Sequence, residues 1–274
     1  MPLAAGMVQV QAPVLVHRRI APDHYWVRVK APVVAKRSRP GQFLHVRCGA
    51  GDFPLLRRPF SLLDADPQTG TVDFIYKVVG FGTETLTRVS ARTKLDLLGP
   101  LGRPFEIPIG LRSAILVGGG VGIPPMVLLA KQLLRRRRSV RVFLGARTGE
   151  WVICVEQFRK LGVPVRIATD DGSRGRKGSV VDLLKDFLER AAEKPVATGL
   201  YVCGPTPMMA AAAALARRRR LPVQVSLEER MGCAMGCCMG CVVEVATESS
   251  GAHARFQRVC TEGPVFPAEA VLWK

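Results

Sequence analysis

The chain has 274 residues, of which 48% are hydrophobic, so it can bury a sizeable core and is not a disordered polymer. Its formal net charge of +18 ordinarily points to nucleic acid as a partner. Two arginine runs, 135–138 and 217–220, nevertheless lie at the ends of predicted helices, where cations favourably oppose the helix dipole. We interpret them as solvated helix ends, with a docking surface for an acidic partner as the alternative, and expect no nucleic-acid partner.

The sequence also lacks the marks of a membrane or exported protein. No apolar run approaches the roughly eighteen residues of a membrane span, and the first residues do not read as a secretory signal. Eight cysteines would suggest disulfides in a secreted chain, but their spacing favours reduced thiols. We therefore expect a cytoplasmic protein with no membrane segment.

The first hundred residues predict short strands separated by proline and glycine. The predicted strands cover residues 8–16, 25–30, 42–46, 60–63, 71–79 and 94–98. Many short strands at this spacing are typical of an antiparallel barrel or sandwich.

Two motifs in this region suit a diphosphate. Residues 58–61 read Arg-Pro-Phe-Ser, and a guanidinium with a nearby hydroxyl can hold phosphate oxygens. Residues 80–83 read Gly-Phe-Gly-Thr and predict a flexible turn with exposed backbone amides. Either motif alone could be an ordinary turn.

From residue 113 the pattern changes to alternating strands and helices. Strands are predicted at 114–117, 140–144, 165–168, 199–202 and 222–226, with helices at 124–138, 152–161, 180–192 and from about 207. This alternation predicts a parallel, doubly wound α/β sheet.

Glycine-rich segments follow two of these strands. Residues 117–125 read Val-Gly-Gly-Gly-Val-Gly-Ile-Pro-Pro between a strand and a helix, and residues 203–205 read Cys-Gly-Pro after another strand. The carboxyl edge of an open α/β sheet is where nucleotides bind, although the glycine-rich turn alone could be only a tight connection. Near the second strand end, Arg147 favours a 2′-phosphate and Glu150 opposes one, so NAD is modestly preferred over NADP.

The cysteines near the end of the chain are the most specific signal. Cys233, Cys238 and Cys241 have C-x4-C-x2-C spacing, and Cys260 follows on a predicted hairpin of strands 242–246 and 255–259 around residues 249–251. This is the ligand pattern of a plant-type [2Fe-2S] cluster, and glycines 232, 236 and 240 let the backbone wrap the sulfides. A zinc site or incidental thiols are the alternatives, but only one C-x2-C pair is present.

The remaining cysteines are not predicted ligands. Cys237 is a surplus thiol beside Cys238, while Cys48, Cys154 and Cys203 stand alone in apolar or glycine-rich surroundings and are expected to be buried. The four histidines are scattered, and no nucleophile has an adjacent base. We therefore assign no catalytic side chain.

Taken in order, these motifs resemble the ferredoxin-reductase superfamily. The resemblance rests on Arg-Pro-Phe-Ser at 58–61, Tyr-Lys-Val-Val-Gly at 76–80, Gly-Pro-Leu-Gly at 99–102, the glycine turn, Cys-Gly-Pro with Met208 and Met209, and the four cysteines. Within it, the chain is most similar to the electron-transfer subunits of NAD-dependent (type B) dihydroorotate dehydrogenases. Ala234 and Cys237 depart from the family loop but leave the four ligands intact.

The resemblance implies an α+β multidomain fold: a β-barrel FAD domain (1–108), a Rossmann-like NAD domain (109–224) and a [2Fe-2S] domain (225–274). It implies FAD contacts at Arg58, Pro59, Phe60, Ser61, Ile75, Tyr76, Lys77, Gly82 and Thr83. It implies nicotinamide-nucleotide contacts at Gly118, Gly119, Gly120, Gly122, Cys203, Gly204 and Pro205, with residues 169–173 on the same side.

The implied activity is that of an oxidoreductase subunit in pyrimidine biosynthesis. Electrons from dihydroorotate would leave FMN on a catalytic partner subunit and pass through the [2Fe-2S] cluster and FAD to NAD, in a heterotetramer with two copies of each chain. Related flavin and cluster subunits serve ferredoxin:NADP reductases and sulfide reductase complexes, which form the alternative. An iron-sulfur sensor that binds nucleic acid is a third possibility, and salt-dependent duplex binding without flavin would reveal it.

Overall fold

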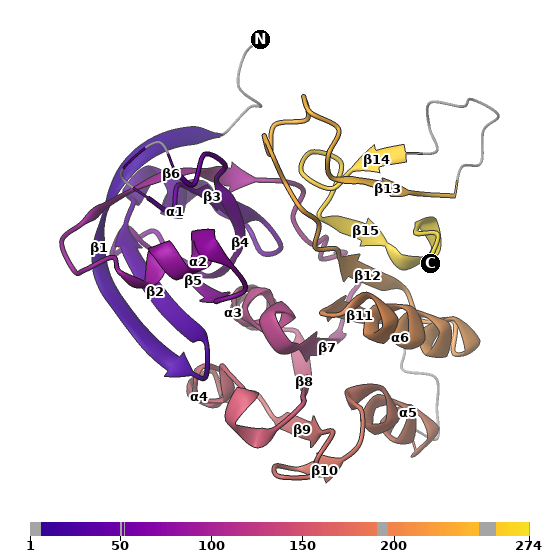
Figure 1. Ribbon diagram of the computed structural model, residues 1–274. Coiled ribbons are helices and arrows are strands. Elements are labelled where there is room, and N and C mark those ends of the chain that lie inside the picture. Colours follow the sequence, from indigo (N-terminus) through magenta and orange to yellow (C-terminus); the bar gives the residue numbers. More distant parts are fainter. Residues whose placement is uncertain (1–6, 50, 52, 191–196, 247–255, 274) are drawn as a thin grey trace.

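A computed structural model describes residues 7–49, 51, 53–190, 197–246 and 256–273. Its elements form a closed barrel, a seven-stranded sheet with helices on both faces, and a cysteine-rich segment with a two-stranded sheet. Figure 1 shows the barrel beside the larger sheet, and the cysteine-rich segment next to both. The predicted α+β multidomain fold is confirmed.

Six antiparallel strands close the barrel in the order β1-β2-β5-β4-β3-β6. Their bounds are β1 (Val8–Ala21), β2 (His24–Lys30), β3 (Phe43–Val46), β4 (Arg58–Asp66), β5 (Thr71–Lys77) and β6 (Lys94–Leu101). Strand β1 runs past its predicted end because its first half pairs with β6 and its second half with β2. Side chains such as Val29, Leu44 and Phe74 fill the barrel and bury its core.

Two short helices of the barrel region were not predicted. They are α1 (Pro32–Arg37) and α2 (Phe81–Thr87). The segment 80–83 was expected to be a flexible turn, and this expectation was wrong, because Gly80 is the cap of α2. The hydroxyl of Thr83 accepts hydrogen bonds from the amides of Val79 (2.9 Å) and Gly80 (3.2 Å) and fixes the start of the helix.

The larger sheet has the order β10-β9-β8-β7-β11-β12-β15. Its strands are β7 (Ser113–Gly119), β8 (Ser139–Ala146), β9 (Val165–Thr169), β10 (Arg176–Lys177), β11 (Thr198–Cys203), β12 (Val223–Ser226) and β15 (Val265–Pro267). All neighbours are parallel except β12 and β15. The predicted parallel α/β arrangement is therefore present, with β15 as an antiparallel edge strand that was not predicted.

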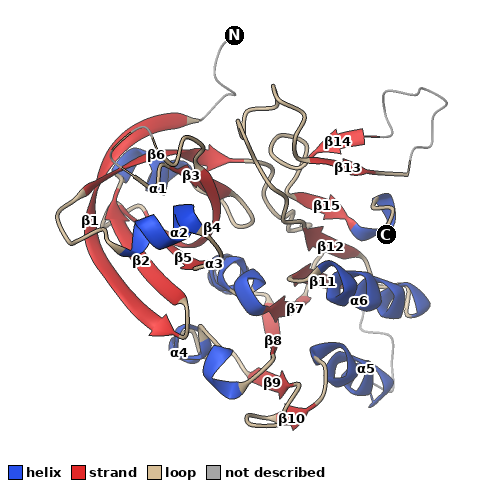
Figure 2. Cartoon of the chain, in the orientation of Figure 1, coloured by secondary structure: helices blue, strands red, loops and turns tan. Residues whose placement is uncertain are grey.

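Helices cover both faces of this sheet (Figure 2). They are α3 (Pro124–Arg135) and α4 (Val155–Lys160) on one face, and α5 (Val180–Arg190) and α6 (Thr206–Arg218) on the other. Alternate residues of β7 serve the two cores, with Leu116 facing α3 and Val117 facing α6. No helix within the described ranges is both long and apolar enough to cross a bilayer.

The cysteine-rich segment leaves the sheet at β12 and returns to it at β15. It contains the hairpin β13 (Val242–Glu244) and β14 (Phe256–Arg258), while the predicted turn at 249–251 lies outside the described residues. Between barrel and sheet, Lys131 on α3 donates to both carboxylate oxygens of Asp64 on β4 at 2.8 Å. This ion pair joins the helix after the glycine turn to the barrel wall.

The glycine turn after β7 is packed against the end of β11. A Cβ atom at Gly122 would overlap the backbone carbonyl of Cys203, which cannot move without disturbing its strand. We predict that Gly122→Ala lowers the free energy of unfolding by about 1–3 kcal/mol, the usual cost of overpacking. Gly110→Ala is the control, because nothing lies within 4 Å of a Cβ there. Equal unfolding midpoints in urea for the two variants would contradict this packing.

Candidate functional site

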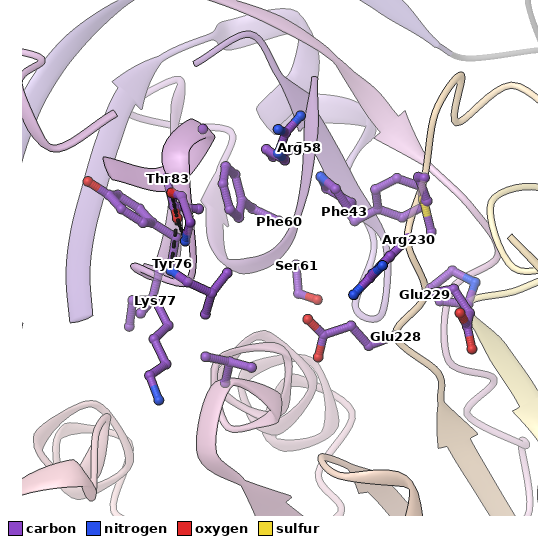
Figure 3. A pocket seen from close by; sticks show the side chains of 18 of the residues that line it. Phe43, Arg58, Phe60, Ser61, Tyr76, Lys77, Thr83, Glu228, Glu229 and Arg230 are labelled. Carbon is purple, nitrogen blue, oxygen red and sulfur yellow. Dashed lines mark hydrogen bonds between the residues drawn. The ribbon is translucent and has the colours of Figure 1, made fainter. Parts of the chain in front are cut away.

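A cavity of about 760 Å³ opens where the barrel, the sheet and the cysteine-rich segment meet (Figure 3). The barrel contributes Phe43, Leu56, Arg58, Pro59, Phe60, Ser61, Ile75, Tyr76, Lys77, Val79, Gly80, Phe81, Gly82 and Thr83. The sheet side contributes Val121 and Cys203, and the following chain contributes residues 226–231 and Pro264. Every barrel residue implicated in FAD binding by the sequence therefore lies on one wall of this cavity.

Arg58 and Gly82 are in close contact on that wall. A Cβ atom at Gly82 would lie 2.8 Å from Nε and 2.9 Å from Nη2 of Arg58, so glycine lets the guanidinium lie flat against the start of α2. The same guanidinium donates to the carbonyl of Leu56. The motifs at 58–61 and 80–83, which are separate in the sequence, thus meet at one surface. The positive charge of Arg58 makes that surface suitable for a diphosphate.

The polar groups of Thr83 and Tyr76 are already used inside the protein. The hydroxyl of Thr83 donates to the carbonyl of Gly80 at 2.8 Å and also accepts the two hydrogen bonds from the amides of Val79 and Gly80. The hydroxyl of Tyr76 pairs with His17 at 2.9 Å, and its ring stacks on Tyr25 at 5.4 Å. Burial raises the pKa of Tyr76, and the neighbouring Tyr25 raises it further. The side chain of Tyr76 therefore remains a neutral phenol. These two residues shape the wall rather than offer free polar groups.

The sequence reasoning missed one wall of the cavity, the segment after β12. Figure 3 shows the side chains of Glu228 and Arg230 directed into the cavity near Ser61. Loss of hydration inside the cavity raises the pKa of Glu228, although the residue as a whole is exposed, and repulsion from Glu229 adds to the shift. The sequence signal for this wall is the charged triplet Glu-Glu-Arg at 228–230. It lies between the strand β12 and residues 231–241, which we call the cysteine loop.

The two predicted glycine-containing strand ends lie side by side. Strands β7 and β11 are hydrogen-bonded neighbours, and Gly118 is paired with Cys203. Cys203 and Val121 reach the cavity, while Gly118, Gly119, Gly120, Gly122, Gly204 and Pro205 lie along the same edge outside its lining. Burial raises the pKa of the Cys203 thiol to about 12, with a further contribution from Glu228, so this thiol stays neutral.

The loops after β8 and β9 extend this edge. Ser173 accepts a hydrogen bond from the amide of Gly149 at 2.7 Å and joins the two loops. Trp151 lies beneath the Lys77 ammonium, which is 3.9 Å from the ring centroid. Arg147 is on the same side of the sheet, 5.9 Å from that centroid. The edge therefore presents cations and an aromatic ring next to the glycine turn.

The four predicted cluster ligands form two pairs of thiols. The backbone amide of Cys238 donates to the sulfur of Cys233, and the side chains of Cys241 and Cys260 interact with each other. In the described part of the chain, no three Cys, His, Asp or Glu side chains are spaced to hold a single metal ion. Two pairs of sulfur ligands fit a cluster of two irons, each of which takes two thiolates.

The surrounding backbone favours thiolate at Cys233. Burial would raise the pKa of this thiol, but amide donors outweigh it and lower the pKa to about 6. The amides of Met235 and Cys238 each lie 3.4 Å from its sulfur. Ligands of a cluster must be deprotonated, so this donor set suits one.

The second pair is more enclosed than the first. Cys241 and Cys260 are each 2% exposed, and burial raises the pKa of Cys260 to about 12, with Cys241 adding to the shift. The amide of Val259 donates to the carbonyl of Cys241 at 2.9 Å and returns the chain to the loop. The surplus Cys237 is exposed, whereas Cys48, Cys154 and Cys203 are buried.

Comparisons with known proteins agree with this architecture. Residues 228–272 match the family model of the iron-sulfur cluster binding domain of dihydroorotate dehydrogenase B, and residues 116–214 match that of the oxidoreductase NAD-binding domain. A solved chain of the NADH-dependent reduced ferredoxin-NADP oxidoreductase is 33% identical, with a TM-score of 0.83, over 96% of this chain and 90% of that one. A ferredoxin reductase of carbazole 1,9a-dioxygenase, at 23% identity and a TM-score of 0.68, shares the fold over 80% of this chain and 69% of its own.

Fold and site thus define a ferredoxin-reductase-like oxidoreductase chain with an iron-sulfur domain. Two curated relatives are both described as dihydroorotate dehydrogenase B (NAD(+)), electron transfer subunit. The one from Desulforamulus reducens is 39% identical over 96% of this chain and 98% of its own, and the one from Bacillus caldolyticus is 42% identical over 93% and 95%. The chain belongs to this family of electron transfer subunits.

The neighbouring residues Cys237 and Cys238 offer a matched test of the ligand set. We predict that Cys238→Ser loses most of the iron, acid-labile sulfide and visible absorbance of the cluster, because one iron loses a thiolate. Cys237→Ser should keep all three, since its side chain lies outside both sulfur pairs. Iron and sulfide analysis of the two purified variants decides the matter, and a reversed result would make Cys237 the ligand.

Gly82→Ala tests the cationic surface at Arg58. The added methyl group displaces the guanidinium, so we predict that FAD binds about tenfold more weakly, equivalent to one charge-assisted hydrogen bond. The stability of the fold should change little, because the atoms that meet the new methyl group lie at the end of the flexible Arg58 side chain. Flavin affinity and the melting temperature of the apoprotein are measured, with Gly110→Ala as the control. Unchanged affinity would remove Arg58 from the flavin site.

Proposed function

We propose that this chain passes electrons from dihydroorotate, oxidised on a catalytic partner subunit, to NAD. One observation carries the proposal: the segment that starts at Ser226 lines the cavity and continues directly to the first cluster ligand, Cys233. Family membership supplies the reaction, because the relatives are described as electron transfer subunits of an NAD(+)-dependent dihydroorotate dehydrogenase. The chain is then the oxidoreductase subunit that serves the nicotinamide nucleotide in pyrimidine biosynthesis.

Three bound groups match three regions of the chain. FAD suits the cavity, a [2Fe-2S] cluster suits Cys233, Cys238, Cys241 and Cys260, and NAD suits the edge formed by the glycine turn and residues 203–205. When bound, the cluster carries single electrons and the flavin exchanges two electrons with NAD as a hydride.

The residues of the chain position these groups. Arg58 provides positive charge against the start of α2, and Ser61 presents its hydroxyl to the cavity near Glu228. The neutral thiol of Cys203 and the ring of Phe60 line the walls. The enclosed pair Cys241 and Cys260 keeps water from one side of the sulfur site.

The proposed domains are residues 1–108 for FAD, 109–224 for NAD and 225–274 for the [2Fe-2S] cluster. They are supported by barrel closure with β6 and by the start of the larger sheet at β7, while β15 ties the third part to the sheet of the second. None of the eight cysteines forms a disulfide, which suits a reducing cytoplasm.

The partner is proposed to be an FMN-containing catalytic subunit, in a heterotetramer with two copies of each chain. Met235 and Met239, 44% and 51% exposed, lie in the cysteine loop and offer apolar surface beside the exposed Cys238. Burial of these methionines by the partner would bring its flavin close to the cluster ligands. No nucleic-acid or membrane partner is part of the proposal.

A second candidate is the flavin and cluster chain of an NADH-dependent ferredoxin:NADP oxidoreductase complex. It is favoured by the 33% identity and TM-score of 0.83 to a solved chain of that kind. The two candidates differ in the partner and in the electron donor, because the same module can serve either.

An anaerobic titration separates these functions. We predict that NADH bleaches both flavin and cluster absorbance of the purified chain, with NADPH at least tenfold less effective per micromolar. Dihydroorotate should bleach them only after a dihydroorotate dehydrogenase catalytic subunit is added. Reduction by NADH with no response to dihydroorotate in that complex would favour the second candidate, and absence of flavin and cluster would reject both.

A further inference from the structure

An ion pair beside the cysteine loop has no place in the function described so far. Arg258 ends β14, two residues before Cys260, and Glu262 follows that cysteine by two residues. The Nε of Arg258 donates to Glu262 at 2.9 Å, its Nη2 donates to the other carboxylate oxygen, and its backbone amide donates at 2.7 Å. Arg258 and Glu262 therefore form a bidentate pair with little freedom, which we call the Arg258–Glu262 pair.

The same guanidinium also holds the cysteine loop. Its Nη1 donates to the carbonyl of Gly236 at 2.8 Å, and Gly236 lies between the ligands Cys233 and Cys238. Because Arg258 lies at the end of β14 and Gly236 lies in the loop, this hydrogen bond fixes the loop against the strand that leads to Cys260.

The pair is also close enough to act on the cluster by its charge. Arg258 stands two residues before the enclosed Cys260, and its Nη1 holds the carbonyl of Gly236 inside the loop between Cys233 and Cys238. The side chains of the pair are 35% and 26% exposed, so water screens them only in part. Reduction of a cluster adds one negative charge, which a nearby cation favours and a nearby carboxylate opposes.

We propose that the Arg258–Glu262 pair sets the reduction potential of the cluster. Arg258 raises the potential, Glu262 lowers it, and their hydrogen bonds hold Gly236 so that both charges keep fixed positions. The proposal deepens the proposed function and rests on its assignment of a [2Fe-2S] cluster to the four cysteines. Arg258 and Glu262 are positioning residues, because neither binds iron.

The charges can be removed one at a time. Arg258→Gln should shift the midpoint potential of the cluster downward, Glu262→Gln should shift it upward, and the double variant should return it toward the wild-type value. Arg258→Lys keeps the charge but loses the fork that reaches both Glu262 and Gly236. This variant should keep a near-wild-type potential while losing iron faster to a chelator.

The measurement is an anaerobic redox titration of the purified flavin-containing chain, followed by electron paramagnetic resonance of the reduced cluster. Arg159→Gln and Glu156→Gln are the controls, because they remove an ion pair of 2.7 Å on α4 and should leave the potential unchanged. Iron and sulfide contents are measured on each sample, so the potentials are compared only between cluster-loaded proteins.

Opposite shifts for the two single charge variants support the proposal. Equal potentials, or shifts of the same sign, in variants with full cluster content would overturn it. If Arg258→Gln does not retain a cluster, Glu262→Gln decides alone, and an unchanged or lower potential rejects the idea. A wild-type chain that binds no cluster would instead refute the proposed function.

Discussion

The pairing of β12 with β15 is the constraint on which the rest of the site depends. Ser226, the last residue of β12, is opposite Val265, the first residue of β15, and the amide of Leu227 donates to the carbonyl of Pro264 at 2.9 Å. The whole cysteine-rich segment is therefore a loop whose two ends are hydrogen-bonded to each other on the edge of the larger sheet. Residues after β12 must cross the cavity before they reach Cys233, and Cys260 must lie close to the point of return.

That closure explains why one cavity belongs to three parts of the molecule. The barrel supplies a cationic wall at Arg58, the parallel sheet supplies Val121 and Cys203, and the loop supplies Glu228 and Arg230. The isolated bridge between Arg103 and Pro264 also joins the end of the barrel to the base of the loop. A flavin held there would contact the nucleotide edge on one side and the chain that carries the cluster ligands on the other.

The environment of the sulfur site is asymmetric. Cys241 and Cys260 are enclosed against the cores of the sheet and loop, whereas Cys238 and the methionines of the loop are open to solvent. An electron carrier needs such a difference, because insulation on one side protects the cluster and exposure on the other permits contact with a partner. The Arg258–Glu262 pair flanks the enclosed Cys260 along the chain and holds the loop at Gly236.

The sequence by itself determined the barrel strands, the alternation of the parallel sheet, the cavity residues of the barrel and the spacing of four cysteines. These are local patterns: strand period, glycine turns and C-x4-C-x2-C spacing act within a few residues. Only the tertiary structure decided that β15 joins the sheet, that Glu228 and Arg230 line the cavity, that Thr83 caps a helix, and that Arg258 holds Gly236. Apart from the helix cap at Thr83, each of these features depends on contacts between segments far apart along the chain. Strand pairing and burial, rather than local propensity, decide such contacts.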